Sequence, residues 1–567
     1  MKDEDANVDP LAPIPYREEE RERLKLAKPT NILLDTSDII HRLEPDQKHS
    51  SSEDSDKVED SDEKDGNKET KTPPNVNLNT KTSIDASPED KNSIKAERET
   101  PEEGGSFKGK FKFSLQFFKV YIQTFCMFLG FLSLYWGTMY NRQSRYTNLE
   151  YVIVLQDLSF TTENGTVIEP LVFNEFSDMV FNNHSILQLG GWQTKQPYQI
   201  EGAARKYNIS IQDELIRMVH HQKIWVGIYI QPNATQQIYN ALASGNVEFA
   251  KTTANSLINC TYEEGRHYSS SAQYVVKHLR ITQQTWASYY IPRIYNAIFE
   301  KLSTDQKMNL LLNSSTLALL NSGPTLKLNN LSPTLPSQVL GPSQLGLIYA
   351  QLFSFHQFNF SLQIHTYLKD KLKFRDYLIY RVVASHINCF LLAFVYCLVT
   401  IIYQVPTSET FGKAGFLVYW CIMYLFLAAC GGINELVVSL LFYFKLNAML
   451  PVWMVANIVI NMSPTFSTLQ LMPKFYGYGN ALPMYCVYHL IKVLFFNTWK
   501  GHMGRLLGIL IIWIVFTNIL LVGFIIYTNR KEKAKQLKEA REKEDGRLQE
   551  WLEKKRSLEQ EHTNLTG

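Results

Sequence analysis

The sequence predicts an α-helical polytopic membrane protein that also carries an α/β domain. Three observations support this fold class. Long apolar runs lie at 120–140 and between 345 and 527 of the 567-residue chain. The polar region between them is dense in Asn-x-Ser/Thr glycosylation signals. Clusters of basic residues precede the first apolar run and follow two of the later ones. Because about 20 apolar residues cross a bilayer, we expect six transmembrane helices, plus an extracellular α/β domain between spans one and two.

The N-terminal tail, 1–113, is predicted to be disordered and cytoplasmic. From Arg17 to Ser106 it contains no Phe, Trp, Tyr or Cys and is rich in Lys, Asp, Glu, Ser and Asn. Such a segment cannot bury enough apolar surface to offset the loss of chain entropy. The formal net charge of the whole chain is only +2, which gives no reason to expect a nucleic-acid partner.

The first span is predicted within 114–140. Four lysines precede its apolar part or lie at its start, and two arginines follow it: Lys108, Lys110, Lys112 and Lys119 against Arg142 and Arg145. Positive charge is enriched on the cytoplasmic side of membrane helices. This asymmetry indicates that the N-terminal tail is cytoplasmic and that the following region is not.

Residues 141–343 are predicted to form a glycosylated extracellular domain with mixed α/β structure. Segments 151–160 and 223–231 have strand character, whereas 212–222 and 271–291 have helical character. Trp192, Trp225 and Trp286 are expected in its core. The N-terminal tail has no glycosylation signal, which supports a non-cytoplasmic location for the domain. The predicted acceptors are Asn164, Asn183, Asn208, Asn233, Asn259, Asn313 and Asn330.

Spans two to six are predicted within 344–528. They are placed at 345–368, 378–403, 415–444, 449–462 and 506–527. The moderately apolar 345–368 is counted as a span because a basic cluster follows it: Lys369, Lys371, Lys373 and Arg375. The charged C-terminal tail, 529–567, opens with a second such cluster. Both termini are therefore expected in the cytoplasm.

A proline-broken segment at 463–503 is predicted to be a re-entrant hairpin on the outer face. Pro464, Pro473 and Pro483 interrupt any continuous helix, and such backbone is tolerated at membrane depth only when buried in protein or facing water. An ordinary seventh span at 481–499 is the alternative, but it would place the basic C-terminal tail outside. Three hairpin cations are candidates for binding anionic lipid headgroups, or else are solvated or pair with protein carbonyls: Lys474, His489 and Lys492.

Two charges inside the predicted spans are the sharpest functional candidates. Glu435 lies in the fourth span and Arg381 near the inner end of the third. A charge in a membrane helix is costly unless it is paired. The two residues either form a structural ion pair, handle protons or substrate, or reach the membrane surface. Gly431 and Gly432 would let another helix approach or act as a hinge. Hydrogen bonds between helices are favoured over a ligand role for His386, Asn388, Asn457 and Asn461.

Several segments resemble a known family. They are LYWGTMY at the end of the first span, LEYVIVLQDL (149–158), WVGIYIQPNATQQIYNALASG (225–245), QLGLIYAQLFSFHQFNF and INMSPTFSTLQLMPKFYGYGNALPM. Over roughly 115–527 the chain resembles the fungal nitrosoguanidine resistance protein family, whose domain has no known function. It is more distantly similar to phage-infection-type proteins and ABC-2-type exporter subunits. The resemblance implies a fungal plasma-membrane protein that confers resistance to toxic compounds and is linked to lipid asymmetry and sphingolipid status.

The expected function is resistance by export or by redistribution of lipids across the bilayer. The alternative is a regulator of membrane lipid status that does not transport and acts through protein partners bound to its tails. The sequence contains no catalytic triad, paired carboxylates or metal cluster that we recognise, so neither an enzyme nor a cofactor or metal is expected. Membrane lipids, toxic small molecules and tail-binding proteins are the expected partners. The plasma membrane is the expected location, with internal membranes as the alternative.

Overall fold

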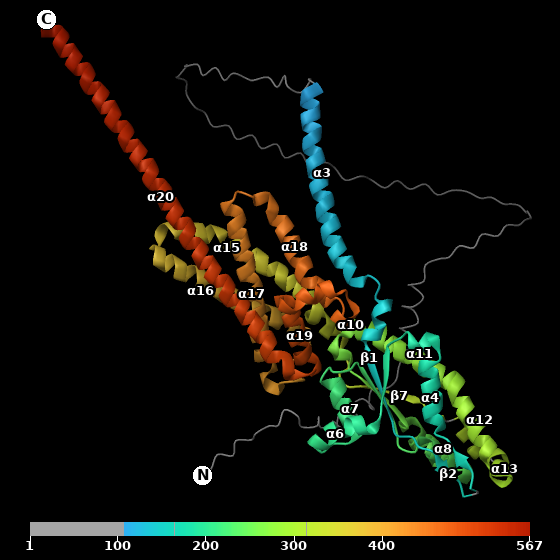
Figure 1. Cartoon of the computed structure of the whole chain (residues 1–567). Helices are drawn as coiled ribbons and strands as arrows, with labels where there is room; N and C mark the ends of the chain where they lie inside the picture. The colour runs from blue at the N-terminus through green and yellow to red at the C-terminus, as the bar shows by residue number, and fades with distance from the viewer. Residues whose placement is uncertain (1–106, 164, 313, 322, 567) are drawn as a thin grey trace, which may run out of the picture. The chain divides into compact units, whose positions relative to one another are not determined.

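The computed structural model describes residues 107–566 except 164, 313 and 322 (Figure 1). Most of the predicted disordered tail, residues 1–106, therefore lies outside the described residues. The first described helix, α3 (Phe107–Trp136), begins seven residues before the predicted span and ends four residues before its predicted end. Its large side chains Phe118, Tyr121 and Phe125 are more than half exposed, as expected for a helix whose surroundings are lipid.

Residues 141–343 form the α/β domain, which is built on a five-stranded sheet. The strand order is β4-β1-β5-β6-β7. Strand β1 is parallel to both β4 and β5, β5 is antiparallel to β6, and β6 is parallel to β7. The five strands are β1 (Glu150–Leu155), β4 (Gly191–Lys195), β5 (Val226–Ile230), β6 (Ile258–Tyr262) and β7 (Leu326–Asn330), and a separate two-stranded ribbon pairs β2 (Phe160–Thr161) with β3 (Val167–Ile168).

Helices cover both faces of this sheet. Alternate residues of β1 point to opposite faces, and they enter two different cores. Tyr151 and Ile153 pack in the core that contains Phe176 of α4, whereas Val152 packs with Leu215 of α7. The helices of the domain are α4 (Leu171–Phe181), α5 (His184–Leu187), α6 (Pro197–Tyr207), α7 (Ile211–His220), α8 (Ala234–Ser244), α9 (Val247–Thr252), α10 (Tyr268–Ser270), α11 (Lys277–Thr285), α12 (Ile291–Lys301), α13 (Thr304–Leu312) and α14 (Ser314–Leu317).

The elements predicted for this domain are present with shifted ends. The two predicted strands correspond to β1 and β5, and the predicted helix 212–222 corresponds to α7. Residues 271–291 are helical throughout, because two π-helical turns flank α11. Trp192, Trp225 and Trp286 are all buried. These elements were predictable because alternation or amphipathic periodicity is strong in each of them.

Most of the helices that follow the α/β domain form a bundle (Figure 1). Its helices are α15 (Gly346–Lys371), α16 (Phe374–Ile402), α17 (Gly415–Tyr443), α18 (Leu450–Met462), α19 (Pro483–Phe496) and α20 (Met503–Thr566). Among the described residues, five helices are long and apolar enough to cross a membrane, and they comprise most of α3, all of α16, α17 and α18, and the apolar part of α20. The chain is therefore a polytopic membrane protein.

Helix α15, the predicted second span, is not among those five. It has 26 residues, about 39 Å at 1.5 Å per residue, so its length suffices to cross a bilayer. Its mean hydropathy is lowered by amide and imidazole side chains, of which Gln351 and His365 are buried against other parts of the chain. The polar side chains of α15 at these two positions therefore contact protein and not lipid. A sixth membrane span remains a prediction.

The predicted hairpin is a series of short turns followed by a short helix. Pro464 lies in a 3-10 turn that ends α18, Pro473 precedes the 3-10 segment Lys474–Ala481, and Pro483 is the first residue of α19. Helix α19 has 14 residues, about 21 Å, which is too short to cross a bilayer of about 30 Å. The prolines therefore stand where helices end or begin.

Candidate functional site

The two intramembrane charges predicted from the sequence are in direct contact. Arg381 on α16 donates a hydrogen bond from Nη2 to Oε1 of Glu435 on α17. Both residues are at most 5% exposed, and the Arg381 guanidinium lies 5.5 Å from the ring centroid of Phe358 on α15. Removing one partner of such a buried pair leaves the other charge uncompensated. The pair therefore joins α16 and α17 beside α15.

A seam of buried amides lies next to this pair, defined here as the amide seam: Gln351, Asn434, Asn457 and Asn461. Asn434 precedes Glu435, and its Oδ1 accepts a 2.8 Å hydrogen bond from Asn457 on α18. Gln351 on α15 donates to the backbone oxygen of Asn457 at 3.1 Å. Hydrogen-bonded amides hold helices together where lipid provides no hydrophobic driving force. The seam thus links α15, α17 and α18.

The predicted inter-helix hydrogen bonds are found at three of four positions. His386 lies 3.1 Å from the Tyr424 hydroxyl and 3.2 Å from Asn518 Nδ2, so it connects α16 with α17 and α20. Asn388 donates to Ser361 of α15 at 3.4 Å. Asn457 belongs to the amide seam. Asn461 instead donates to Asn457 one turn earlier in its own helix.

A close contact between α17 and α20 depends on Gly432. A Cβ atom at this position would lie 2.4 Å from Oγ1 of Thr517 on α20. Real Cβ atoms do not tolerate such a distance, so a larger residue would push the helices apart. Gly431 and Gly432 are predicted from the sequence either to let another helix approach or to act as a hinge. The structure shows the close approach at Gly432, as small residues at helix interfaces allow.

The hairpin satisfies its interrupted backbone through side chains. Gln344 donates to the backbone oxygen of Thr465 at 3.2 Å, Tyr478 to that of Ile460 at 3.2 Å, and Trp513 to that of Ala481 at 2.6 Å. Backbone groups freed from a helix at membrane depth need such partners. The irregular segment is therefore held in one conformation by the helices around it.

Of the three candidate cations in the hairpin, Lys474 is exposed, His489 is half-buried and Lys492 is 1% exposed. The Lys492 ammonium donates to the backbone oxygen of Arg266 in the α/β domain and lies 4.7 Å from the Tyr488 ring centroid. It therefore contacts a protein carbonyl and not solvent, so that of the two candidate lysines only Lys474 is exposed.

Arg266, His267 and Lys492 define the junction between the α/β domain and the hairpin. The Arg266 guanidinium donates to the backbone oxygens of Ile224 and Gln222, at 2.6 and 2.9 Å. The neighbouring Ser270 hydroxyl lies 3.0 Å from that of Ser467 in the hairpin. The junction thus fixes the hairpin to one end of the sheet through buried polar contacts.

Residues 120–519, more than half of the chain, match the family model described as a protein of unknown function, DUF3533. The chain belongs to the DUF3533 family. A Saccharomyces cerevisiae protein described as an uncharacterized endoplasmic reticulum membrane protein is similar to it, with 25% identity over 416 residues, 72% of this chain and 79% of that protein. No solved structure matches the chain. The fungal family resemblance is thereby supported at the level of DUF3533, and nitrosoguanidine resistance remains a prediction.

The DUF3533 region contains the ion pair, the amide seam, the hairpin and the junction. The sequence singled out Arg381, Glu435 and Lys492 as polar groups in apolar surroundings. It missed Gln351 and Asn434, although both stand in apolar runs and carried the same signal. The sequence around Arg266 did not indicate its role at the junction. Its partner Lys492 lies 226 residues away in the chain, so only the fold brings the two together.

The junction of the DUF3533 protein is expected to weaken as pH falls. Burial lowers the pKa of His267 well below 6.5, and the nearby Lys492 lowers it further. The folded state then binds fewer protons than the unfolded state, so stability falls as pH drops below about 6.5. Hydrogen exchange of the detergent-solubilised protein should give lower protection factors for residues 264–271 at about pH 5.5 than at about pH 7.5.

His267→Asn provides the comparison for this prediction. Asparagine keeps an acceptor for the backbone N–H of Ser270, which lies 3.3 Å from His267 Nδ1, but it does not titrate. The variant should show a flatter pH dependence of opening. An unchanged pH dependence would assign the effect to another group.

The predicted glycosylation acceptors differ in accessibility. Asn164 and Asn313 lie outside the described residues. Asn208 and Asn233 are exposed, whereas Asn183 caps α5 through its side chain. Asn259 lies in the interior strand β6, between β5 and β7, and donates to Ser256 O at 2.9 Å. Asn330 in β7 donates to Glu264 Oε2 at 2.8 Å and accepts from the Glu264 N–H at 3.1 Å.

We expect glycans at Asn208 and Asn233 and none at Asn330, provided that the α/β domain faces the lumen or the exterior. The amide of Asn330 is already used by Glu264, so a glycan there would compete with the fold. Asn208→Gln and Asn233→Gln should each increase gel mobility by one glycan, and Asn330→Gln should not. Peptide mass spectrometry that finds Asn330 fully occupied would contradict this.

Proposed function

We propose that the protein confers resistance to toxic compounds such as nitrosoguanidine, by exporting them or by altering the lipid distribution across the bilayer. The observation that carries this proposal is the buried Arg381–Glu435 pair, with the amide seam beside it, among membrane helices. Ionisable residues within membrane segments are rare, pair with one another, and mark substrate, ion or proton pathways. The pair and the seam together provide polar groups that a moving substrate or proton needs.

The proposal includes a topology of six spans with both termini in the cytoplasm, an ABC-2-like layout and an extracellular α/β domain. Contacts between the ends of helices support it. Lys369 at the end of α15 pairs with Glu532 of α20 at 2.8 Å, and Lys531 donates to Tyr443 at the end of α17 at 2.7 Å. These basic ends lie together, as the positive-inside rule expects of one cytoplasmic face.

The test is a flux measurement in cells that lack the protein, that carry the wild type, or that carry Glu435→Gln. Accumulation of a labelled toxic compound and inward movement of a labelled phospholipid are measured at equal surface expression. Glu409→Gln, an exposed carboxylate in the loop between α16 and α17, is the matched control. We expect the wild type and Glu409→Gln to lower accumulation or shift lipid movement, and Glu435→Gln to do neither. Equal fluxes in all four strains with persisting resistance would rule out transport.

A second candidate is a regulator of membrane lipid status that does not transport and acts through protein partners. It is favoured by α20, which continues beyond its apolar part to Thr566 as one helix and exposes Leu548, Trp551 and Leu552. Exposed large apolar side chains on a charged helix suit a protein partner. Replacing these three residues by alanine should abolish resistance if the protein is a regulator and leave resistance intact if it is a transporter.

We propose the plasma membrane as the location, with internal membranes of the secretory pathway as the alternative. The relative in Saccharomyces cerevisiae is described as an endoplasmic reticulum membrane protein, which supports the alternative. Both membranes present the α/β domain to a non-cytoplasmic compartment. We further propose that the chain has no catalytic activity of its own and that its partners are membrane lipids, toxic small molecules and proteins bound to its tails. Microscopy of a tagged full-length chain decides the location.

A further inference from the structure

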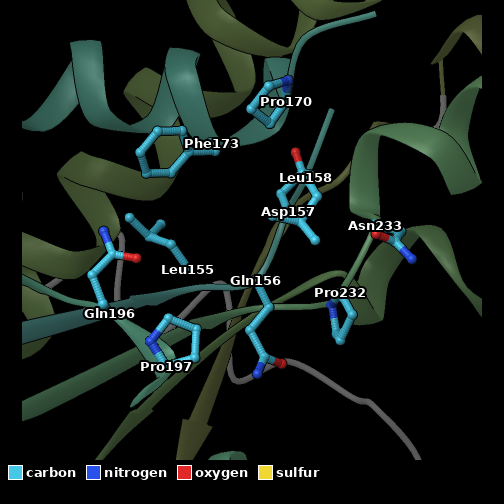
Figure 2. A pocket seen from close by; sticks show the side chains of 10 residues that line it. All are labelled: Leu155, Gln156, Asp157, Leu158, Pro170, Phe173, Gln196, Pro197, Pro232 and Asn233. Atoms are coloured by element: carbon cyan, nitrogen blue, oxygen red, sulfur yellow. The ribbon is translucent and has the colours of Figure 1, made fainter. Parts of the chain in front are cut away.

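A cavity of about 500 Å³ opens at one edge of the sheet in the α/β domain. Figure 2 shows its lining, which comes from the residues that follow three parallel strands. Gln156 and Asp157 follow β1, Gln196 follows β4 and Asn233 follows β5. The strand order β4-β1-β5 places β1 between the two strands that come after it in sequence. In parallel sheets this is the point where connections leave in opposite directions and where ligands bind.

The cavity is pre-formed, because its floor is fixed by buried hydrogen bonds. Asp157 is 6% exposed, and its two carboxylate oxygens accept from the N–H of Thr235 at 3.0 Å and from its hydroxyl at 2.6 Å. The same hydroxyl accepts from the N–H of Val172 at 3.0 Å. Burial raises the pKa of Asp157, and the bonds from Thr235 oppose this. These hydrogen bonds connect the end of β1 to the starts of α4 and α8. The carboxylate of Asp157 therefore has a structural role.

The remaining polar groups of the lining are uncharged amides. Figure 2 shows Gln196 and Asn233 on opposite sides of the cavity, with Gln156 between them. None of the ten lining residues is lysine or arginine, so no lining side chain supplies a positive charge to a phosphate or carboxylate group. Amides donate and accept hydrogen bonds and therefore suit hydroxyl and carbonyl groups. An anion would also meet the carboxylate of Asp157.

Apolar groups complete the lining. Phe173, Leu155 and Leu158 together with the three prolines provide flat or bulky surfaces. A largely apolar wall with a few amides matches a small molecule that has hydroxyl groups at its edge and C–H groups on its face. An uncharged sugar has this distribution, and the cavity volume lies in the range of small-molecule sites, about 300–1,000 Å³.

The rim of the cavity also carries a glycosylation signal. Asn233 is exposed and is followed by Ala234 and Thr235, which completes an Asn-x-Thr signal. A glycan attached to Asn233 would begin at the cavity mouth. The same sugar chemistry can thus arrive from two sources, a glycan on this chain or a free saccharide.

We propose that this cavity is a binding site for an uncharged saccharide, supplied either by the glycan on Asn233 or from solution. Its polar contacts are the amides of Gln196 and Asn233 and the Nε2 group of Gln156, whose Oε1 already accepts a 2.6 Å hydrogen bond from the Tyr229 hydroxyl. Its apolar contact is the ring of Phe173. The inference goes beyond the proposed function and depends on it only for the non-cytoplasmic location of the domain.

The test is hydrogen exchange of the detergent-solubilised full chain in peptides covering 155–173 and 232–238. The probe is N,N′-diacetylchitobiose, which has the structure of the first two sugars of an N-linked glycan. Glucose 6-phosphate is the charged comparison. Asn233→Gln removes the attachment signal and keeps an amide, and Asn208→Gln is the matched control that removes an exposed signal elsewhere. Gln196→Ala removes an exposed amide from the lining.

If the glycan on Asn233 fills the site, Asn233→Gln should accelerate exchange, Asn208→Gln should not, and the probe should restore protection to the Asn233→Gln variant. If a free saccharide fills it, the probe should slow exchange in the wild type and in Asn233→Gln alike. Saturating probe at about ten times its Kd should slow opening about tenfold, and Gln196→Ala should reduce this protection.

Two results would overturn the proposal. One is exchange that responds neither to loss of the Asn233 signal nor to the probe. The other is protection by glucose 6-phosphate without protection by the probe, which would identify a site for anions. Neither result depends on flux. Mass spectrometry of Asn208 separately reports whether the domain faces a glycosylating compartment.

Discussion

Arg381→Met alone should destabilise the protein strongly, whereas Arg381→Met combined with Glu435→Leu should restore most of the lost stability. The single change leaves the buried Glu435 carboxylate without its partner, and breaking a buried pair from one side costs about 3–5 kcal/mol. The double change removes both charges and refills the space with apolar atoms, which is often neutral or stabilising. Thermal unfolding of detergent-solubilised protein, followed by size-exclusion chromatography, measures the difference.

The same variants decide between the two meanings of the pair. If it is only structural, the double variant should recover both stability and resistance. If it handles protons or substrate, the double variant should recover stability while resistance and flux stay at the level of cells without the protein. Glu532→Gln is the matched control, because Glu532 pairs with Lys369 with both side chains about half exposed. Such exposed pairs contribute about 0–1 kcal/mol. A single Arg381→Met variant as stable as the wild type would contradict the observed burial.

Lys492→Glu should be the most damaging charge change in the hairpin. It would bring a carboxylate against the backbone oxygen of Arg266, at a position where the Lys492 side chain is only 1% exposed. The Arg266 guanidinium cannot turn to it without leaving the oxygens of Ile224 and Gln222. An unpaired buried charge costs about 3–5 kcal/mol. We expect loss of monodisperse protein at temperatures that the wild type tolerates.

Two companion variants separate a buried contact from a surface role. Lys492→Met keeps the apolar stem and leaves one carbonyl without its donor, a cost of about 1–3 kcal/mol. Lys474→Glu changes an exposed hairpin lysine and should stay within about 0.5 kcal/mol of the wild type. If Lys492→Glu left stability unchanged but reduced binding to anionic vesicles, Lys492 would face lipid headgroups. That result would contradict the buried contact between Lys492 and Arg266.

The sequence predicted the fold wherever the pattern was local. Apolar runs located α16, α17 and the first part of α20, and alternation located β1 and β5. The end of α3 moved because helix boundaries depend on tertiary contacts. Helix α15 was found only through the basic residues after it, because Gln351 and other polar side chains that face protein reduce its hydropathy. A hydropathy average cannot tell whether a polar side chain faces lipid or a neighbouring helix.

The sites were predictable to the extent that a residue was out of place in its own segment. Glu435, Arg381 and Lys492 are charges in apolar surroundings, and each has a buried partner. The cavity in the α/β domain had no such signal. Gln156, Gln196 and Asn233 are ordinary loop residues, and only the strand order brings them to one edge. That order results from long connections, which no local pattern encodes.

The unbroken path of α20 has a mechanical consequence. The helix runs from Met503 to Thr566, and its solvent-exposed part is stabilised by i,i+4 ion pairs at Lys535–Glu539 and Lys538–Glu542. From Tyr527 to Thr566 it extends about 58 Å at 1.5 Å per residue. A rigid rod of that length converts a tilt of about 10° at the membrane into a displacement of about 10 Å at its tip. Rearrangements around the Arg381–Glu435 pair, which lies on helices packed against α20, would thus be amplified at Trp551, where a second protein could read them.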